Sequence, residues 1–185
     1  MQNSLILCGD RPAAAVALSS VLRGYLQHFG PLPPALDWTA SPECSAQELL
    51  PGLWRELTAV SAPALITAPP LASPLTRDAL VAEVARDFRL PVLALSAWEE
   101  DGVERLVALA AIARVHGVPW LGVVLGLGDR PAPDEATAQW LEDLTGLPLI
   151  GGLPAGVTDP GAVVSGWRLE DLPSGLGQVA LEGVR

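Results

Sequence analysis

The chain contains no lysine, because all 11 of its basic residues are arginines. This absence excludes any chemistry that requires a lysine ammonium group. Positive charge is scarce overall, since 21 acidic residues give a formal net charge of −10. A chain this acidic is poorly suited to bind nucleic acid or an anionic membrane surface, and we expect neither as a partner.

Cysteine is also scarce, and Cys8 and Cys44 do not have the spacing of metal ligands. We therefore expect free thiols in a reducing cytosol and no metal site. No apolar run is long enough to span a bilayer, and the opening MQNS lacks the basic start of a signal peptide, which favours a cytoplasmic location. Local sequence suggests no Ser-His-Asp or Cys-His arrangement, so we name no catalytic residue.

Hydrophobic residues make up half of the chain, and residues 90–126 show their pattern most clearly. LPVLAL (90–95) predicts a strand buried on both faces, and PWLGVVL (119–125) predicts the next strand. Between them, Ser96 and Glu99 have the spacing of a capping box, and Gly117 is suited to end a helix. The apolar stripe of that helix is expected to be Val103, Leu106, Val107 and Ala110.

The remainder of the chain repeats this alternation. Further strands are expected at 4–8, 35–38, 63–67 and 147–150. Helices are expected from Pro12 to Phe29, over 43–60 with a break at Pro51, from Ser73 to Phe88, and from Asp134 to Thr145, where Trp140, Leu141 and Leu144 would be buried. The pattern predicts a single domain over 1–185, a doubly wound, mostly parallel α/β sheet with helices on both faces. Its C-terminal segment, 154–185, is expected to be irregular, with a weak helical piece at 176–181.

Four stretches resemble the dethiobiotin synthetase family and occur in the family's order. They are LPVLAL (90–95), ARVHG (113–117), LGVVL (121–125) and PLIGGLP (148–154). The resemblance implies a fold of the P-loop NTPase class and a homodimer. It also implies an activity that closes the ureido ring of the biotin precursor with ATP, magnesium and carbon dioxide.

The chain departs from this family where the family's chemistry resides. The family's first turn, G-x-x-x-x-G-K-T, holds phosphates and magnesium through its backbone, lysine and threonine. Here the turn reads GDRPAAA (9–15), which lacks the second glycine, the lysine and the threonine. TAPP (67–70) replaces the family's magnesium-binding E-G-A-G-G run, SAWEED (96–101) replaces its substrate-pocket turn, and Gly126 replaces its adenine-reading asparagine. These losses together should leave no useful rate of phosphoryl transfer.

Two groups of residues remain candidates for ligand contact. The first lies in the opening turn, where a helix N-terminus could retain an anion, although a plain turn capped by Asp10 or Arg11 is the favoured interpretation. Its members are Gly9, Asp10, Arg11 and Ala13. The second is expected at the carboxyl edge of the sheet, where open α/β folds bind ligands. Its members are Ser96, Trp98, Glu99, Gly126, Gly151 and Pro154.

Three hypotheses follow. The favoured one is a dethiobiotin synthetase-like protein with a degenerate nucleotide site, non-catalytic and without a cofactor, which acts by dimerisation or by binding a small molecule or a protein partner. The alternative is a divergent ATP-dependent dethiobiotin synthetase with a rebuilt site, which would need ATP and magnesium. The third is another P-loop descendant, of the cobyrinic-acid or partitioning type, that works only beside another chain.

Overall fold

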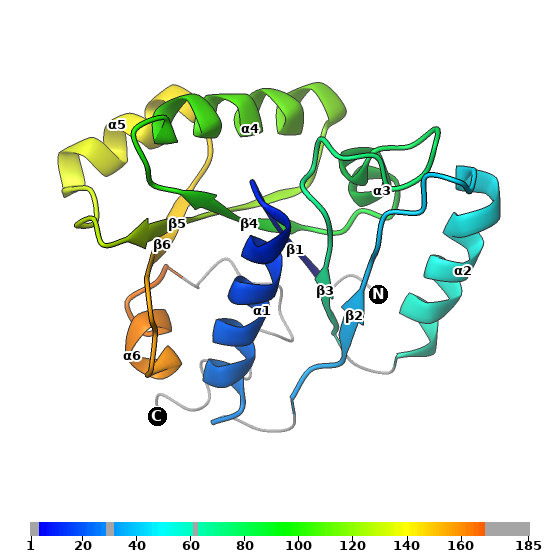
Figure 1. Cartoon of the computed structure of the whole chain (residues 1–185), viewed down its shortest axis with the longest axis horizontal. Coiled ribbons are helices and arrows are strands. Elements are labelled where there is room, and N and C mark those ends of the chain that lie inside the picture. Colours follow the sequence, from blue (N-terminus) through cyan, green and yellow to red (C-terminus); the bar gives the residue numbers. More distant parts are fainter. Residues whose placement is uncertain (1–3, 29–31, 61–62, 169–185) are drawn as a thin grey trace.

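A computed structural model describes residues 4–28, 32–60 and 63–168 (Figure 1). Its centre is a six-stranded sheet in the order β2-β3-β1-β4-β5-β6, with every neighbouring pair parallel. The strands are β1 (Leu5–Gly9), β2 (Ala35–Asp37), β3 (Leu65–Thr67), β4 (Val92–Ala97), β5 (Trp120–Gly128) and β6 (Leu149–Pro154). This arrangement confirms the predicted doubly wound, parallel α/β fold.

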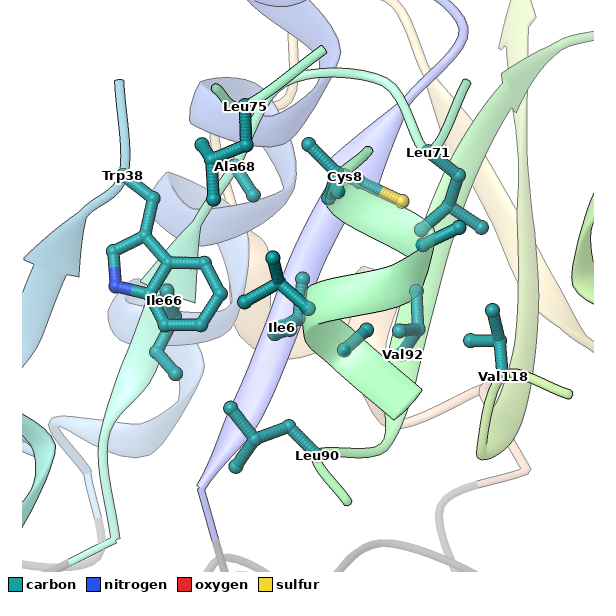
Figure 2. Packing of buried hydrophobic residues seen from close by; sticks show 14 of the residues in the cluster. Ile6, Cys8, Trp38, Ile66, Ala68, Leu71, Leu75, Leu90, Val92 and Val118 are labelled. Carbon is teal, nitrogen blue, oxygen red and sulfur yellow. The ribbon is translucent and has the colours of Figure 1, made fainter. Parts of the chain in front are cut away.

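Helices cover both faces of the sheet, with α1 and α6 below it and α3, α4 and α5 above it in the view of Figure 1. Side chains that alternate along β1 therefore enter different layers: Leu5 and Leu7 pack with α1, whereas Ile6 and Cys8 pack with α3 (Figure 2). All four are fully buried. The helices are α1 (Pro12–Leu26), α2 (Ala46–Ala59), α3 (Val81–Asp87), α4 (Gly102–His116), α5 (Glu135–Thr145) and α6 (Pro160–Val164).

Helix α2 is continuous, so the predicted break at Pro51 is wrong. Pro51 removes one backbone donor from the helix, while the first turn is held independently by a capping box. The Glu48 carboxylate accepts bonds from the backbone N–H of Ser45 at 2.7 Å and from its hydroxyl at 2.8 Å. These bonds hold the pKa of Glu48 below its usual range.

Helix α3 begins at Val81, not at Ser73 as predicted. The preceding segment instead folds back on the helix, because the backbone N–H of Val81 donates to the carbonyl of Ser73 at 3.1 Å. This path buries Leu71 and Leu75 in the core. The Glu83 carboxylate then caps the helix by accepting a bond from Leu80 N–H at 2.8 Å. The apolar periodicity therefore predicted the helix correctly, but Ser73, the residue predicted to start it, lies in the preceding loop.

Three side chains predicted to be buried are instead exposed on α4 and α5. They are Val107, Trp140 and Leu144. The buried residues of α4 are Gly102, Leu106, Ala110 and Ala113. Those of α5 are Leu141 and Thr145. The helix ends were predicted correctly: Gly117 and Gly146 take the left-handed backbone with φ of 63° and 67°, and Asp134 caps α5 by accepting a bond from Thr137 N–H.

The predicted irregular segment 154–185 contains one helix within its described part. Helix α6 begins at Pro160 and is capped by Asp159, which accepts a bond from Ala162 N–H at 3.2 Å. The weak helical piece predicted at 176–181 and the predicted helix end at Phe29 lie outside the described residues. Among the described residues, none of the helices is long and apolar enough to cross a membrane.

Two glycines allow a test of the packing with opposite expected signs. A Cβ added at Gly122 in β5 would lie 2.8 Å from the Pro148 carbonyl and 2.5 Å from an Ile150 methylene, so Gly122→Ala should destabilise the fold by about 1–3 kcal/mol. At Gly52, within α2, a Cβ meets nothing within 4 Å. Gly52→Ala should therefore stabilise the fold by about 0.5–1 kcal/mol. Urea unfolding measures both, and a neutral Gly122→Ala would contradict the close β5–β6 packing.

Candidate functional site

The connection between β1 and α1 is only two residues long, because β1 ends at Gly9 and α1 begins at Pro12. Asp10 N–H donates to the carbonyl of Leu95 at 3.2 Å, and Ala14 N–H donates to the carbonyl of Arg11 at 3.0 Å. A Cβ added at Gly9 would lie 2.2 Å from the Ala14 methyl carbon. The turn is thus closed on itself, and the Ala14 side chain packs directly against it.

Asp10 does not cap α1. The N-cap position belongs to Arg11, which has extended backbone and makes no side-chain cap bond. The Asp10 carboxylate instead reaches the end of β4, where its Oδ2 accepts both a bond from Ala97 N–H at 2.9 Å and a bond from Arg105 Nη1 at 3.2 Å. Of the two predicted cap residues, Arg11 therefore occupies the N-cap position, and the alternative, Asp10, is wrong. The carboxylate is an anion of the protein itself, held between the ends of β1 and β4.

Arg105, on the second turn of α4, is the centre of an ion-pair cluster. Besides Asp10, it pairs with Asp101 at 2.9 Å and approaches Glu99 at 3.7 Å. Arg11 closes the cluster by donating from Nη2 to both Glu99 oxygens, at 2.9 and 2.7 Å. We call these five residues the edge cluster: Asp10, Arg11, Glu99, Asp101 and Arg105.

The edge cluster sets three carboxylates against two guanidinium groups. Each cation therefore already has an internal partner, and the charge around them disfavours a polyanion. The pairing with Arg105 lowers the pKa of Asp101, and the reciprocal interaction raises the pKa of Arg105. Within residues 4–28, 32–60 and 63–168, no three His, Cys, Asp or Glu side chains gather in a way that could hold a metal ion.

The remaining residues of the opening turn and of β4 lie close to this cluster. Ala13 is exposed on the first turn of α1. Trp98 N–H donates to the carbonyl of Gly126 at 2.9 Å, which joins the ends of β4 and β5. Ser96 is a buried residue of β4, so its predicted role in a capping box with Glu99 is wrong. Its hydroxyl has no hydrogen-bond partner in the part of the chain that the structure describes.

The strand predicted at 147–150 extends further, because β6 covers Leu149–Pro154 and thus includes Gly151 and Pro154. A Cβ added at Gly151 would lie 2.2 Å from the Trp167 ring, so this glycine serves packing. Pro154 is exposed at the end of the strand and pairs in register with Gly128. The structure therefore brings together the candidate residues at the carboxyl ends of β1, β4 and β5. Gly151 and Pro154 lie on β6, the edge strand.

Cys8 adds no nucleophile to the site. Its side chain is fully buried in β1, in the same apolar cluster as Ile6 and Leu71 (Figure 2), and this burial raises the pKa of the thiol to about 12. The thiol therefore stays protonated near neutral pH. Cys8 is thus a core residue with a free thiol, as expected from the sequence.

A hollow of about 470 Å³ lies at the carboxyl ends of β2 and β3, beside α1. Its walls are mostly apolar, and its clearest polar feature is Asp37, whose carboxylate accepts a bond from the Thr67 hydroxyl at 2.6 Å. A second hollow, of about 460 Å³, lies between α5 and β6 and includes the ion pair of Glu142 with Arg168. Gly151, a predicted contact residue, lines the second hollow, whereas no candidate residue named from the sequence lines the first.

Arg105 was also missed by sequence reasoning, although a signal existed. Asp101 and Arg105 have the i, i+4 spacing of a helical ion pair. That spacing predicts the local pair but not the partner at Asp10, which is 95 residues away in sequence. The Arg11–Glu99 pair spans 88 residues and has no local signal at all.

Comparison with known proteins gives partial similarity. No family model matches the chain. It is similar to the ATP-dependent dethiobiotin synthetase BioD of Bacillus thuringiensis (strain Al Hakam), Bacillus cereus (strain B4264) and Bacillus anthracis (strain CDC 684 / NRRL 3495), with 33% identity over 87 residues in each case. The match covers 45% of this chain and only 36% of each relative. This similarity supports a relation to P-loop NTPases.

Among solved structures, the chain aligns with a ParA family ATPase from Chlorobium tepidum TLS. The alignment covers 98% of this chain and 99% of that one, with a TM-score of 0.47 and 10% sequence identity.

The edge cluster makes a testable prediction about protonation. In Arg105→Gln, the pKa of Asp101 should rise toward its ordinary value, because the guanidinium that depresses it is removed. Carboxyl-carbon NMR titration measures this change. Since a depressed carboxyl pKa stabilises the fold above the unfolded-state pKa and loses this effect as pH falls, the pair's stabilisation should disappear in acid.

Two other aspartates serve as internal controls for this titration. The pKa of Asp78 is lowered mainly by Ala46 N–H, and that of Asp134 by Thr137. Both should titrate unchanged in Arg105→Gln. An unchanged Asp101 would show that Arg105 does not hold the cluster together in solution.

Proposed function

We propose that this protein is a dethiobiotin synthetase-like member of the P-loop NTPases whose nucleotide position is degenerate, and that it acts by binding and not by phosphoryl transfer. The observation that carries this proposal is the closed two-residue turn between β1 and α1, whose Asp10 carboxylate is bound to Ala97 N–H. An anion belonging to the protein thus lies where a strand-to-helix turn would otherwise present its donors to a phosphate.

The charges around this turn support the same proposal. Phosphoryl transfer depends on positioned cations that neutralise the transferring group. The chain has no lysine to supply one, and Arg11 and Arg105 are both engaged by carboxylates. Bringing either arginine to a phosphate would leave Glu99 or Asp10 facing that phosphate unpaired.

The hollow at the ends of β2 and β3 is the best place for a small ligand. Open parallel α/β sheets bind ligands outside the carboxyl ends of their strands, and this hollow lies there. Its proline-rich, largely apolar wall fits an uncharged or weakly polar molecule. The Asp37–Thr67 pair offers the polar contact that would orient such a molecule.

A second candidate function is supported by the names of the relatives. The Bacillus proteins are ATP-dependent dethiobiotin synthetases, and the matched segment is 33% identical to them. Under this alternative, a rebuilt site would use ATP and magnesium to make dethiobiotin. The match covers 36% of each relative, so it supports common ancestry more strongly than it supports a shared activity.

Calorimetry with Mg-ATP tests the proposed loss of nucleotide binding. We expect no heat of binding up to millimolar nucleotide, because the turn offers neither space nor free cations. The Bacillus cereus relative, measured in the same buffer, is the positive control. Magnesium-dependent binding in the micromolar range would contradict the proposal.

Genetic complementation separates the two candidate functions. Expressed in a biotin auxotroph that lacks its own dethiobiotin synthetase, this protein should fail to restore growth without biotin. The Bacillus cereus relative expressed to the same level should restore growth. Rescue by the present chain would establish the alternative, provided that immunoblotting shows comparable soluble expression.

A further inference from the structure

Strand β6 lies at one edge of the sheet and carries no charge of its own. It is six residues long, whereas β2, at the other edge, has three. No charged residue occurs from 144 to 158. Edge strands can pair with strands of other molecules, and short length, charged side chains or proline commonly prevent this. Of these protections, β6 itself has only Pro154, at its last position. Residues 165–168, which we call the β6 strap, lie along this edge beside α6 (Figure 1).

The β6 strap bonds three carbonyls of β6 in succession. The Trp167 indole N–H donates to the Gly152 carbonyl at 3.0 Å. The Arg168 backbone N–H donates to the Ile150 carbonyl at 2.8 Å, and the Arg168 Nε donates to the Leu149 carbonyl at 2.9 Å. The strap therefore runs opposite to β6 and occupies acceptors that an added strand would need.

Two charged side chains from outside β6 complete this contact. The Glu142 carboxylate of α5 accepts a bond from Leu149 N–H at 2.6 Å and pairs with the Arg168 guanidinium. The Glu142 side chain is 19% exposed, and that of Arg168 is 53% exposed. Charge is thus placed beside a strand that carries none. It opposes the addition of another strand, because that strand would have to bury the charged groups or separate them.

The β6 strap is anchored by Trp167. Its indole is 7% exposed and packs in the apolar cluster that includes Ile150 and Leu153. A Cβ added at Gly151 would lie 2.2 Å from the indole ring, so the missing side chain of this glycine provides the space in which the ring lies. The buried ring fixes the position of the strap, and the bonds of Arg168 then close the edge.

We propose that the β6 strap blocks this edge of the sheet, so that an extended strand of another molecule cannot add to β6. Arg168 is the residue on which the block depends most, because it joins the strap to both α5 and β6. Opening the strap would leave the carbonyls of Leu149, Ile150 and Gly152 unpaired on an uncharged strand. That is the condition under which edge strands pair with other chains.

Substitution of Arg168 in the full chain tests the block. Arg168→Ala should raise the rate of self-association, followed by light scattering at fixed protein concentration, about tenfold, the factor expected when a bond to a charged group is lost. Trp167→Phe keeps a ring over Gly151 but removes the bond to Gly152, so it should give a smaller increase. Arg130→Ala, at an exposed position in the loop after β5, changes the net charge equally and is the matched control, which should leave the rate unchanged.

Hydrogen exchange locates the contact in the associated Arg168→Ala protein. The backbone amides of β6 should gain protection relative to the monomer, whereas those of β2, the other edge strand, should exchange as before. Circular dichroism verifies that each variant folds. If neither Arg168→Ala nor Trp167→Phe associates faster than Arg130→Ala, or if association leaves exchange in β6 unchanged, the inference is overturned. None of these results depends on nucleotide binding, so this inference can fail while the proposed function stands, and the reverse.

Discussion

Burial of the parallel sheet on both faces is the constraint from which the arrangement of polar groups follows. Leu5, Ile6, Leu7 and Cys8 of the central strand are all fully buried, so β1 can carry no charge along its length. Polar side chains near β1 are thereby confined to the strand ends. The parallel register pairs Gly9 with Leu95, which brings the residues after both strands to the same edge. The edge cluster forms there because the sheet permits ions in few other places near its centre.

Because apolar residues fill the layers and polar residues lie only at the strand ends, residues at the strand ends can differ without altering the fold. The layers are held by apolar side chains of the strands and helices, and the edge cluster contributes none of them. A strand-to-helix turn can therefore lose residues and gain a carboxylate without disturbing the core. Fold and site are physically separable in this molecule, so similarity in sequence to another protein says little about the chemistry at the turn.

The part of the structure that could be predicted from sequence is the part with local causes. Buried runs predicted the strands, and Gly117, Gly146 and Asp134 marked helix ends because their effects act within one turn. The candidate site was harder, since its contacts join distant segments. Asp10 was assigned a local capping role, yet its carboxylate bonds Ala97 and Arg105. No periodicity encodes such a pairing, which exists only once β1 and β4 are side by side.

The errors on α4 and α5 have a different cause. Apolar spacing assigned Val107, Trp140 and Leu144 to the core, whereas all three are exposed. An apolar sequence pattern does not identify the element that a side chain packs against. Because Leu106, Ala110 and Leu141 already fill the layer beneath these helices, the remaining apolar residues have no room there. Exposed apolar side chains grouped on neighbouring helices are a feature that such spacing rules cannot distinguish from core residues.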